Sequence, residues 1–230
     1  MTTPRTGRRM ALTLLGLTAS AALIVLLAFQ WQFFTSDPEP YAAASTPGRI
    51  DVGFVQTMTV HHRQAILMSQ LMLDGRETAV SSLARRIANT QLYEVGQMEG
   101  WLRLWQESLH PRPLRMGWML LGDTPLDTET EQYLLDCEQS PTGMPGLATL
   151  QQLETLRASR GLAGDRRFLQ MMLDHHQGGI PMARFAARHA HLKVVRDLAA
   201  QIVLEQSREI DLISRMLFAL PREESTNVAD

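Results

Sequence analysis

Apolar side chains recur every three or four positions along two long stretches of the chain, which is the spacing of one face of an α-helix. The first stretch begins at Asp51, and these residues fall on or beside one side of a helix: Phe54, Met58, His61, His62, Met68 and Met72. The second begins at Asp165 and places matching residues on the same side: Phe168, Met172, His175, His176 and Met182. A capping residue belongs just before such a period, so Asp51 and Asp165 are predicted to be the N-caps of two helices.

The second stretch is a copy of the first. The block DVGFVQTMTVHHRQAILMSQ, from Asp51, aligns without a gap with DRRFLQMMLDHHQGGIPMAR, from Asp165. After one inserted or deleted residue, two further blocks with aliphatic stripes also align, at about residues 79–108 and 192–219. Their shared residues are Leu83, Ala84, Ile87, Gln91 and Glu94 in the first block, and Leu198, Ala199, Ile202, Gln206 and Glu209 in the second. Each repeat is therefore predicted to be a pair of helices joined by a turn.

Two duplicated helical hairpins predict an all-α fold, a four-helix bundle with an approximate twofold axis. The two repeats, the crossover between them and a C-terminal tail are predicted at residues 51–108, 165–220, 109–164 and 221–230. The crossover is punctuated by prolines and is expected to carry short helices. One of these helices should start at the capping box formed by Thr149 and Gln152.

A membrane segment is predicted ahead of the bundle. Residues 10–29 form a run of twenty residues without a charged side chain, which is long enough to cross a bilayer core. Three arginines precede this run, so the positive-inside rule places the N-terminus in the cytoplasm and the bundle outside it. The chain is thus predicted to be a single-pass protein of the cell membrane, with a cytoplasmic N-terminus at 1–9, a signal anchor at 10–34 and a linker at 35–50. A cleaved signal peptide is the alternative, although its candidate site at Ala42 and Ala44 lies far beyond the apolar run.

Composition removes several classes of function. A formal charge of -2 and an isoelectric point near 6.4 leave no basic excess for a phosphate backbone, so no nucleic-acid partner is expected. The single cysteine, Cys137, excludes an intramolecular disulfide and a cysteine-based zinc site, and it is expected to be an inert, half-buried thiol. The sequence contains no nucleophile elbow, phosphate loop or dinucleotide fingerprint. Histidine and methionine are left as the informative side chains, because most of them lie in the repeated blocks.

The repeated spacing Met-x-x-His-His-x5-Met supplies two sets of candidate metal ligands. They are Met58, His61, His62 and Met68 in the first repeat, and Met172, His175, His176 and Met182 in the second. Neutral imidazole and thioether ligands without a thiolate select copper, Cu(I) above all, over magnesium or calcium. Because Met58 is three or four residues from the two histidines, one metal ion could bind both residue types on one helix face.

Two other interpretations of these residues stay open. Methionine commonly fills apolar cores, and a buried histidine is often a hydrogen-bonded core residue, in which case the chain is a structural or partner-binding bundle. A ferritin-like iron oxidase or storage protein would instead need carboxylate ligands in Glu-x-x-His motifs, but the third residue before each leading histidine is a methionine. Four polar residues lie on the aliphatic stripes of the second helices and are therefore expected to orient the histidine rings rather than to bind the metal, with each Glu accepting a ring N–H: Gln91, Glu94, Gln206 and Glu209.

The two repeats are not equivalent around their histidines. Gly178, Gly179 and Pro181 follow the histidines of the second repeat and are predicted to interrupt and kink its helix. The first repeat carries Ala65 and Leu67 at the positions of Gly179 and Pro181. One of the two sites is therefore expected to be better formed than the other.

The two HH blocks, each followed by an L-A-x-x-I-x3-Q-x-x-E segment, and the MPG sequence at Met144–Gly146 resemble the bacterial domain-of-unknown-function 305 family, over about residues 51–217. The resemblance implies a ferritin-like helical bundle that is usually exported and often attached to a membrane, with some members linked to copper binding and copper tolerance. It places the family's His and Met motif on the eight candidate ligands. The chain departs from the family at Leu147, where many relatives carry Met, and at Ile213, where the first repeat has Met98, so each departure removes a sulfur atom.

The sequence therefore predicts a membrane-anchored, extracytoplasmic protein that binds copper through His and Met, in copper homeostasis or tolerance. No catalysed reaction is expected. The expected partners are the membrane, through the N-terminal helix, and a metal ion, whereas the sequence indicates no particular protein partner.

Overall fold

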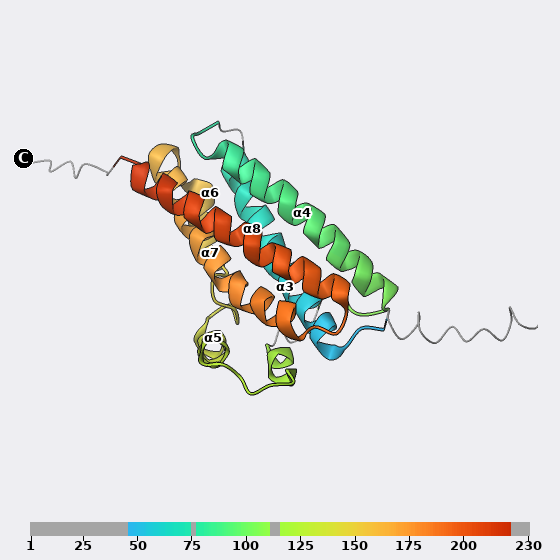
Figure 1. The fold of residues 1–230 in the computed structure, drawn as a ribbon. Helices are drawn as coiled ribbons and strands as arrows, with labels where there is room; N and C mark the ends of the chain where they lie inside the picture. The colour runs from blue at the N-terminus through green and yellow to red at the C-terminus, as the bar shows by residue number, and fades with distance from the viewer. Residues whose placement is uncertain (1–45, 75–76, 111–115, 222–230) are drawn as a thin grey trace, which may run out of the picture. The chain divides into compact units, whose positions relative to one another are not determined.

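The computed structural model describes residues 46–74, 77–110 and 116–221, and within these ranges the chain is helical without any strand (Figure 1). Its α-helices are α3 (Arg49–Leu73), α4 (Ser81–Leu104), α5 (Thr128–Gln139), α6 (Leu150–Ala158), α7 (Gly161–His189) and α8 (Lys193–Ala219). A short 3-10 helix, η1, spans Gly117–Leu121. The predicted all-α fold is confirmed for the part of the chain that the structure describes.

The predicted cytoplasmic N-terminus and signal anchor lie outside the described residues, together with most of the linker and of the tail. Within the described ranges, no helix has both the length and the apolar character needed to cross a bilayer. The membrane topology therefore stays a prediction.

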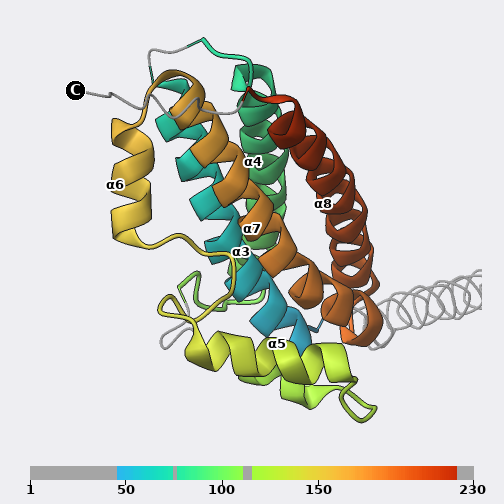
Figure 2. The ribbon, with the colours of Figure 1, turned by 90° about the vertical axis from the view of Figure 1, so that its left-hand side faces the viewer.

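The four long helices form the two hairpins of the duplication. α3 packs along α4 and α7 packs along α8, while α3 and α7 also lie against each other (Figure 2). α3 and α7 run in opposite directions along this central contact. The result is a four-helix bundle with an approximate twofold relation between the repeats. α8 has nearly its predicted bounds, whereas α4 ends about one turn earlier than predicted.

The predicted N-cap at Asp51 is wrong. α3 begins earlier, at Arg49, with Gly48 as the N-cap residue, so Asp51 lies in the first turn. Its carboxylate accepts the Gly48 N–H at 2.6 Å and, with the other oxygen, the Leu192 N–H at 2.9 Å. The N-cap residue is a glycine, which has no side chain to mark the start of the helix in the sequence. Asp51 thereby joins the start of α3 to the turn between α7 and α8.

The crossover contains η1, α5 and α6, which lie on the outside of the bundle (Figure 2). The predicted capping box of α6 is confirmed, because Thr149 Oγ1 accepts the Gln152 N–H at 3.3 Å and Gln152 Oε1 accepts the Thr149 N–H at 2.7 Å. α7 begins at Gly161, about one turn before Asp165. The second predicted N-cap is therefore also wrong, and because α4 ends about one turn early as well, the crossover is displaced toward the N-terminus rather than shortened.

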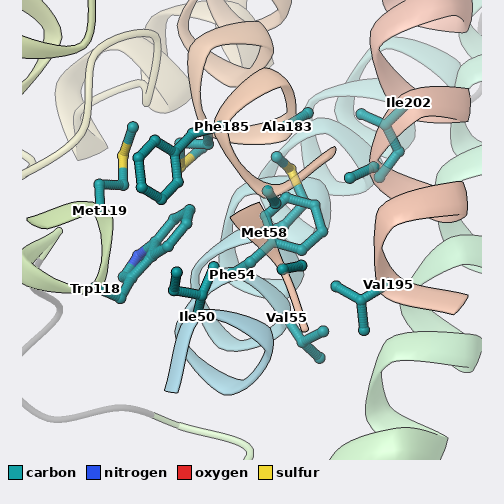
Figure 3. Close-up of a cluster of buried hydrophobic side chains, with 14 of the residues drawn as sticks. Ile50, Phe54, Val55, Met58, Trp118, Met119, Ala183, Phe185, Val195 and Ile202 are labelled. Atoms are coloured by element: carbon teal, nitrogen blue, oxygen red, sulfur yellow. The ribbon is translucent and has the colours of Figure 1, made fainter. Parts of the chain in front are cut away.

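Two clusters of buried apolar side chains fill the bundle, with the histidines between them. Along α3, Met58 belongs to the first cluster and Met68 to the second, and His61 and His62 lie between these two positions. Figure 3 shows part of the first cluster, where Met58 points into the space among α3, α7 and α8. On α4, α7 and α8 as well, buried polar residues lie between a residue of one cluster and a residue of the other. A layer of polar residues therefore crosses the middle of an otherwise apolar core.

The predicted interruption of the second repeat's first helix is wrong. α7 is one helix from Gly161 to His189 with Pro181 inside it. Gly178 instead allows a close backbone contact with the crossover, because a Cβ atom there would lie 2.1 Å from the carbonyl oxygen of Pro145. The hydroxyl of Tyr133 also donates to the Gly178 carbonyl at 2.9 Å. The glycine lets the crossover approach α7 beside the histidines and does not end the helix.

Gly146 provides a test of this close approach. Its φ of +82° is unfavourable for an L side chain, and an added Cβ atom would lie 2.5 Å from the Asp174 carbonyl oxygen. Gly146→Ala should therefore lower the free energy of unfolding by about 3 kcal/mol, of which the backbone conformation accounts for about 1 kcal/mol. Gly143→Ala is the matched control, since Gly143 has a φ of +77° and open space around it. Urea unfolding of both variants measures the difference, and equal losses would contradict the predicted close contact.

Candidate metal centre

The four histidines of the repeats lie together in the middle of the bundle. His61, His62, His175 and His176 are all fully buried. The rings of His61 and His175 stack across the contact of α3 and α7, with centroids 3.7 Å apart and planes inclined by 34°. His175 Nε2 donates to the backbone carbonyl of His61 at 2.9 Å. The antiparallel packing of α3 and α7 thus brings the two predicted HH pairs into one place.

The second helix of each repeat, α4 or α8, supplies a carboxylate to the histidines of the same repeat. Glu94 Oε2 on α4 lies 2.8 Å from His62 Nε2, and Glu209 Oε2 on α8 lies 2.6 Å from His176 Nε2. Glu94 is 3% exposed, so its charge is almost wholly inside the protein. A carboxylate in this position accepts the Nε2–H and fixes the tautomer and the orientation of the ring. Each carboxylate therefore holds one histidine ring in place through its Nε2 atom.

All four rings leave Nδ1 without a hydrogen-bond partner, although each Nδ1 is buried. Three of the rings are held at Nε2, by Glu94, by Glu209 or by the His61 carbonyl. A metal-binding histidine typically donates its second ring N–H to a carboxylate or a backbone carbonyl and binds the ion with the other nitrogen. The three held rings already have this arrangement. His61 is different, since neither of its ring nitrogens has a partner.

Two amide side chains lie in the same layer without partners. Gln91 and Gln206 are 2% and 3% exposed, and none of their side-chain nitrogen or oxygen atoms forms a hydrogen bond. A Cβ atom on Gly179 would lie 2.9 Å from Gln206 Oε1 and 2.8 Å from His61 Cε1, so the amide and the ring both border this glycine. Buried polar atoms without partners are rare in proteins. Their concentration around the histidines is the property expected of a site that binds a further polar or charged group.

The four candidate methionines are fully buried and divide between the two apolar clusters. Met58 of the first repeat shares a cluster with Met182 of the second, and Met172 shares the other cluster with Met68. Because the helices are antiparallel, each repeat's first methionine is grouped with the other repeat's second methionine. Sulfur donors are therefore available on both sides of the histidine layer.

Two further residues belong to this region. The sequence indicates Met98 as a sulfur of the first repeat, although not as a candidate ligand, and it does not indicate Arg86. Met98 on α4 belongs to the cluster of Met58, as its place on the stripe of Gln91 and Glu94 suggests. Arg86 Nε lies 3.5 Å from Glu209 Oε1, an ion pair across the bundle from α4 to α8 that helix periodicity cannot reveal.

Cys137 and two histidines outside the repeated motif lie elsewhere. Cys137 on α5 is free and buried rather than half-buried, and burial raises the pKa of its thiol to about 11. The ring of His189, at the end of α7, packs on Phe185 with centroids 4.5 Å apart, and His191 in the following turn is exposed. Among the described residues, no three His, Cys, Asp or Glu side chains are gathered so that they could hold one metal ion.

The repeated blocks, the bundle and the crossover agree with one known family. A model of the domain of unknown function DUF305 matches residues 51–217. The chain belongs to this family. A DUF305 protein from Streptomyces coelicolor, named as a candidate secreted protein, has 33% sequence identity and a TM-score of 0.60, and the match covers 74% of this chain and 91% of that chain. No curated protein matches the chain.

Two further solved structures share the fold. A DUF305 fragment from Deinococcus radiodurans has 26% identity and a TM-score of 0.56, with 75% of this chain and 98% of that chain covered. CopM in its Cu(II)-bound form has 24% identity and a TM-score of 0.53, with 73% of this chain and 95% of CopM covered. At that identity the likeness to CopM establishes the fold alone.

The buried histidines predict how the metal-free protein responds to acid. Burial lowers the pKa of His61 and of His175 well below 6.5, and the neighbouring histidines lower it further. The unfolded chain therefore binds more protons than the folded chain below pH 6.5, so stability is full above that pH and falls as the solution becomes more acidic. Between pH 6.5 and 5 the free energy of unfolding should drop by up to about 1.4 kcal/mol per pH unit for each of the two histidines.

Urea unfolding of the metal-free protein across this range measures the slope. His61→Gln with His175→Gln should flatten it, because the two titrating rings are gone. A slope that is unchanged in this variant would assign the pH dependence to other groups.

Proposed function

We propose that this protein binds copper, as Cu(I) above all, through His61, His62, His175 and His176 together with Met58, Met68, Met172 and Met182. The observation that carries the proposal is the set of four buried Nδ1 atoms without partners, three of them on rings held at Nε2. Such rings are oriented before the ion arrives, so binding requires little reorganisation. The role is to hold copper or to pass it on, in copper homeostasis or tolerance, without a catalysed reaction.

The donor types favour copper over other ions. Neutral imidazole and thioether sulfur suit Cu(I), which accepts soft ligands, whereas magnesium and calcium require oxygen. Glu94 and Glu209 face the histidines at hydrogen-bonding distance, which supports a role in orienting rings over the role of di-iron ligands. CopM, a protein of the same fold, is known in Cu(I)-bound and Cu(II)-bound forms.

Copper should stabilise the folded protein if the histidines are its ligands. A ligand present at a hundred times its Kd adds about 2.7 kcal/mol to the free energy of unfolding. For a domain of this size, the Tm of the full chain in detergent should rise by roughly 5–10 °C with Cu(I) under reducing conditions. Replacing His61, His62, His175 and His176 with Gln should remove this rise and leave the metal-free protein folded. Differential scanning calorimetry of both proteins, with and without Cu(I), makes the comparison.

Two further variants make the result specific. His189→Gln with His191→Gln is the matched control and should keep the full Cu(I) effect. Met58→Leu with Met172→Leu should weaken the effect of Cu(I) far more than that of Zn(II), because leucine keeps the volume and removes the soft donor. If the wild-type protein gains no stability from Cu(I), the proposal fails and the histidines are structural residues of the core.

We further propose that residues 10–34 anchor the chain in the cell membrane, with the bundle outside the cytoplasm. The uncharged run and the preceding arginines support this topology. A protease added to intact cells should then digest residues 45–230, detected with an antibody against the bundle. Digestion that occurs only after lysis would show the bundle to be inside the cytoplasm.

A further inference from the structure

The two Glu–His pairs of the bundle differ in charge. Glu209 contacts His176 through Oε2 and Arg86 through Oε1, which lies 3.5 Å from the Arg86 Nε atom. Glu94 contacts His62 through Oε2, but its Oε1 is buried without any hydrogen-bond partner. The second repeat therefore has a compensated carboxylate, and the first has a carboxylate that only its histidine faces.

The duplication explains why the difference exists. Arg86 lies eight positions before Glu94 on α4, and the matching position on α8, eight before Glu209, is Gln201. A twofold operation that carries Arg86 onto Gln201 also carries Glu209 onto Glu94. Gln201 is neutral, and its Nε2 donates to Glu205 on its own helix at 2.9 Å. The first repeat therefore receives no cation in the place where the second receives Arg86.

The supply of sulfur differs in the same direction. Met98 on α4 is fully buried and shares a cluster with Met58. Met58 lies one helical turn before His62 on α3. Its counterpart on α8 is Ile213, also fully buried, which shares a cluster with Met172. The second helix of the first repeat thus carries a buried sulfur at a position where the second helix of the other repeat carries none.

We propose that the two repeats form two copper sites of unequal strength, a tight one around His62 and Glu94 and a weaker one around His176 and Glu209 that Arg86 weakens further. This inference rests on the proposed function and specifies its stoichiometry and order of filling. An uncompensated buried carboxylate stabilises a bound cation, whereas the guanidinium of Arg86 is always charged and reduces that effect at Glu209. Arg86 acts through Glu209 and is a positioning residue rather than a ligand.

Cu(I) titration of the full chain in detergent, in competition with a Cu(I) chelator of known affinity, tests this inference. The wild-type protein should bind two ions in two separate steps. His62→Gln should remove the tight step, and His176→Gln should remove the weak one. Arg86→Gln should tighten the weak step by roughly tenfold and leave the tight step unchanged, and Arg86→Lys should restore the wild-type value.

Two more variants separate a specific effect from a general one. Gln201→Arg should give Glu94 its missing cation and weaken the tight step by roughly tenfold. Arg85→Gln is the matched control, because the neighbouring Arg85 pairs with the exposed Glu77 at 2.8 Å, and it should change neither step.

The outcomes distinguish this inference from the proposed function. If the wild-type protein binds no Cu(I), the proposed function fails. If it binds Cu(I) in one step of uniform affinity, or if Arg86→Gln leaves both steps unchanged or shifts them equally, only the unequal pair of sites is overturned.

Discussion

The stacked rings of His61 and His175 set the geometry of the whole bundle. A centroid separation of 3.7 Å and the hydrogen bond to the His61 carbonyl require α3 and α7 to lie close together. Gly179 permits this approach, since a Cβ atom there would meet the His61 ring at 2.8 Å. Burying a layer of imidazole, amide and carboxylate groups is unfavourable by itself. The apolar clusters on either side of the layer offset that cost.

The duplication and the helical period allowed most of the fold to be predicted from the sequence. They place Met58, His61 and Met68 on one face of one helix, and that part needs only the helical period. They do not show which faces meet. The grouping of Met58 with Met182 follows from the antiparallel packing of α3 and α7, which is a tertiary property. The start of α3 was missed for a local reason, because its N-cap residue, Gly48, has no side chain to mark it.

The crossover is held by both repeats at matching positions, although by different means. On α7, Gly178 lets the Pro145 carbonyl come close to the helix backbone. On α3 the matching residue is Gln64, whose side-chain amide both donates to and accepts from the backbone of Ala148, at 2.8 Å and 2.6 Å. A single segment of the crossover therefore bridges the two repeats beside the histidine layer. A substitution that looks unremarkable in one repeat can for this reason be damaging at the equivalent place in the other.

The contacts of Asp51 have a mechanical consequence. One buried carboxylate holds the N–H of Gly48, at the entrance to the bundle, and the N–H of Leu192, in the turn between α7 and α8. Tension applied to the chain ahead of Gly48 is therefore shared between both hairpins at once. The force acts on two elements in parallel, so the first turn of α3 cannot unfold by itself while both hydrogen bonds of Asp51 are intact.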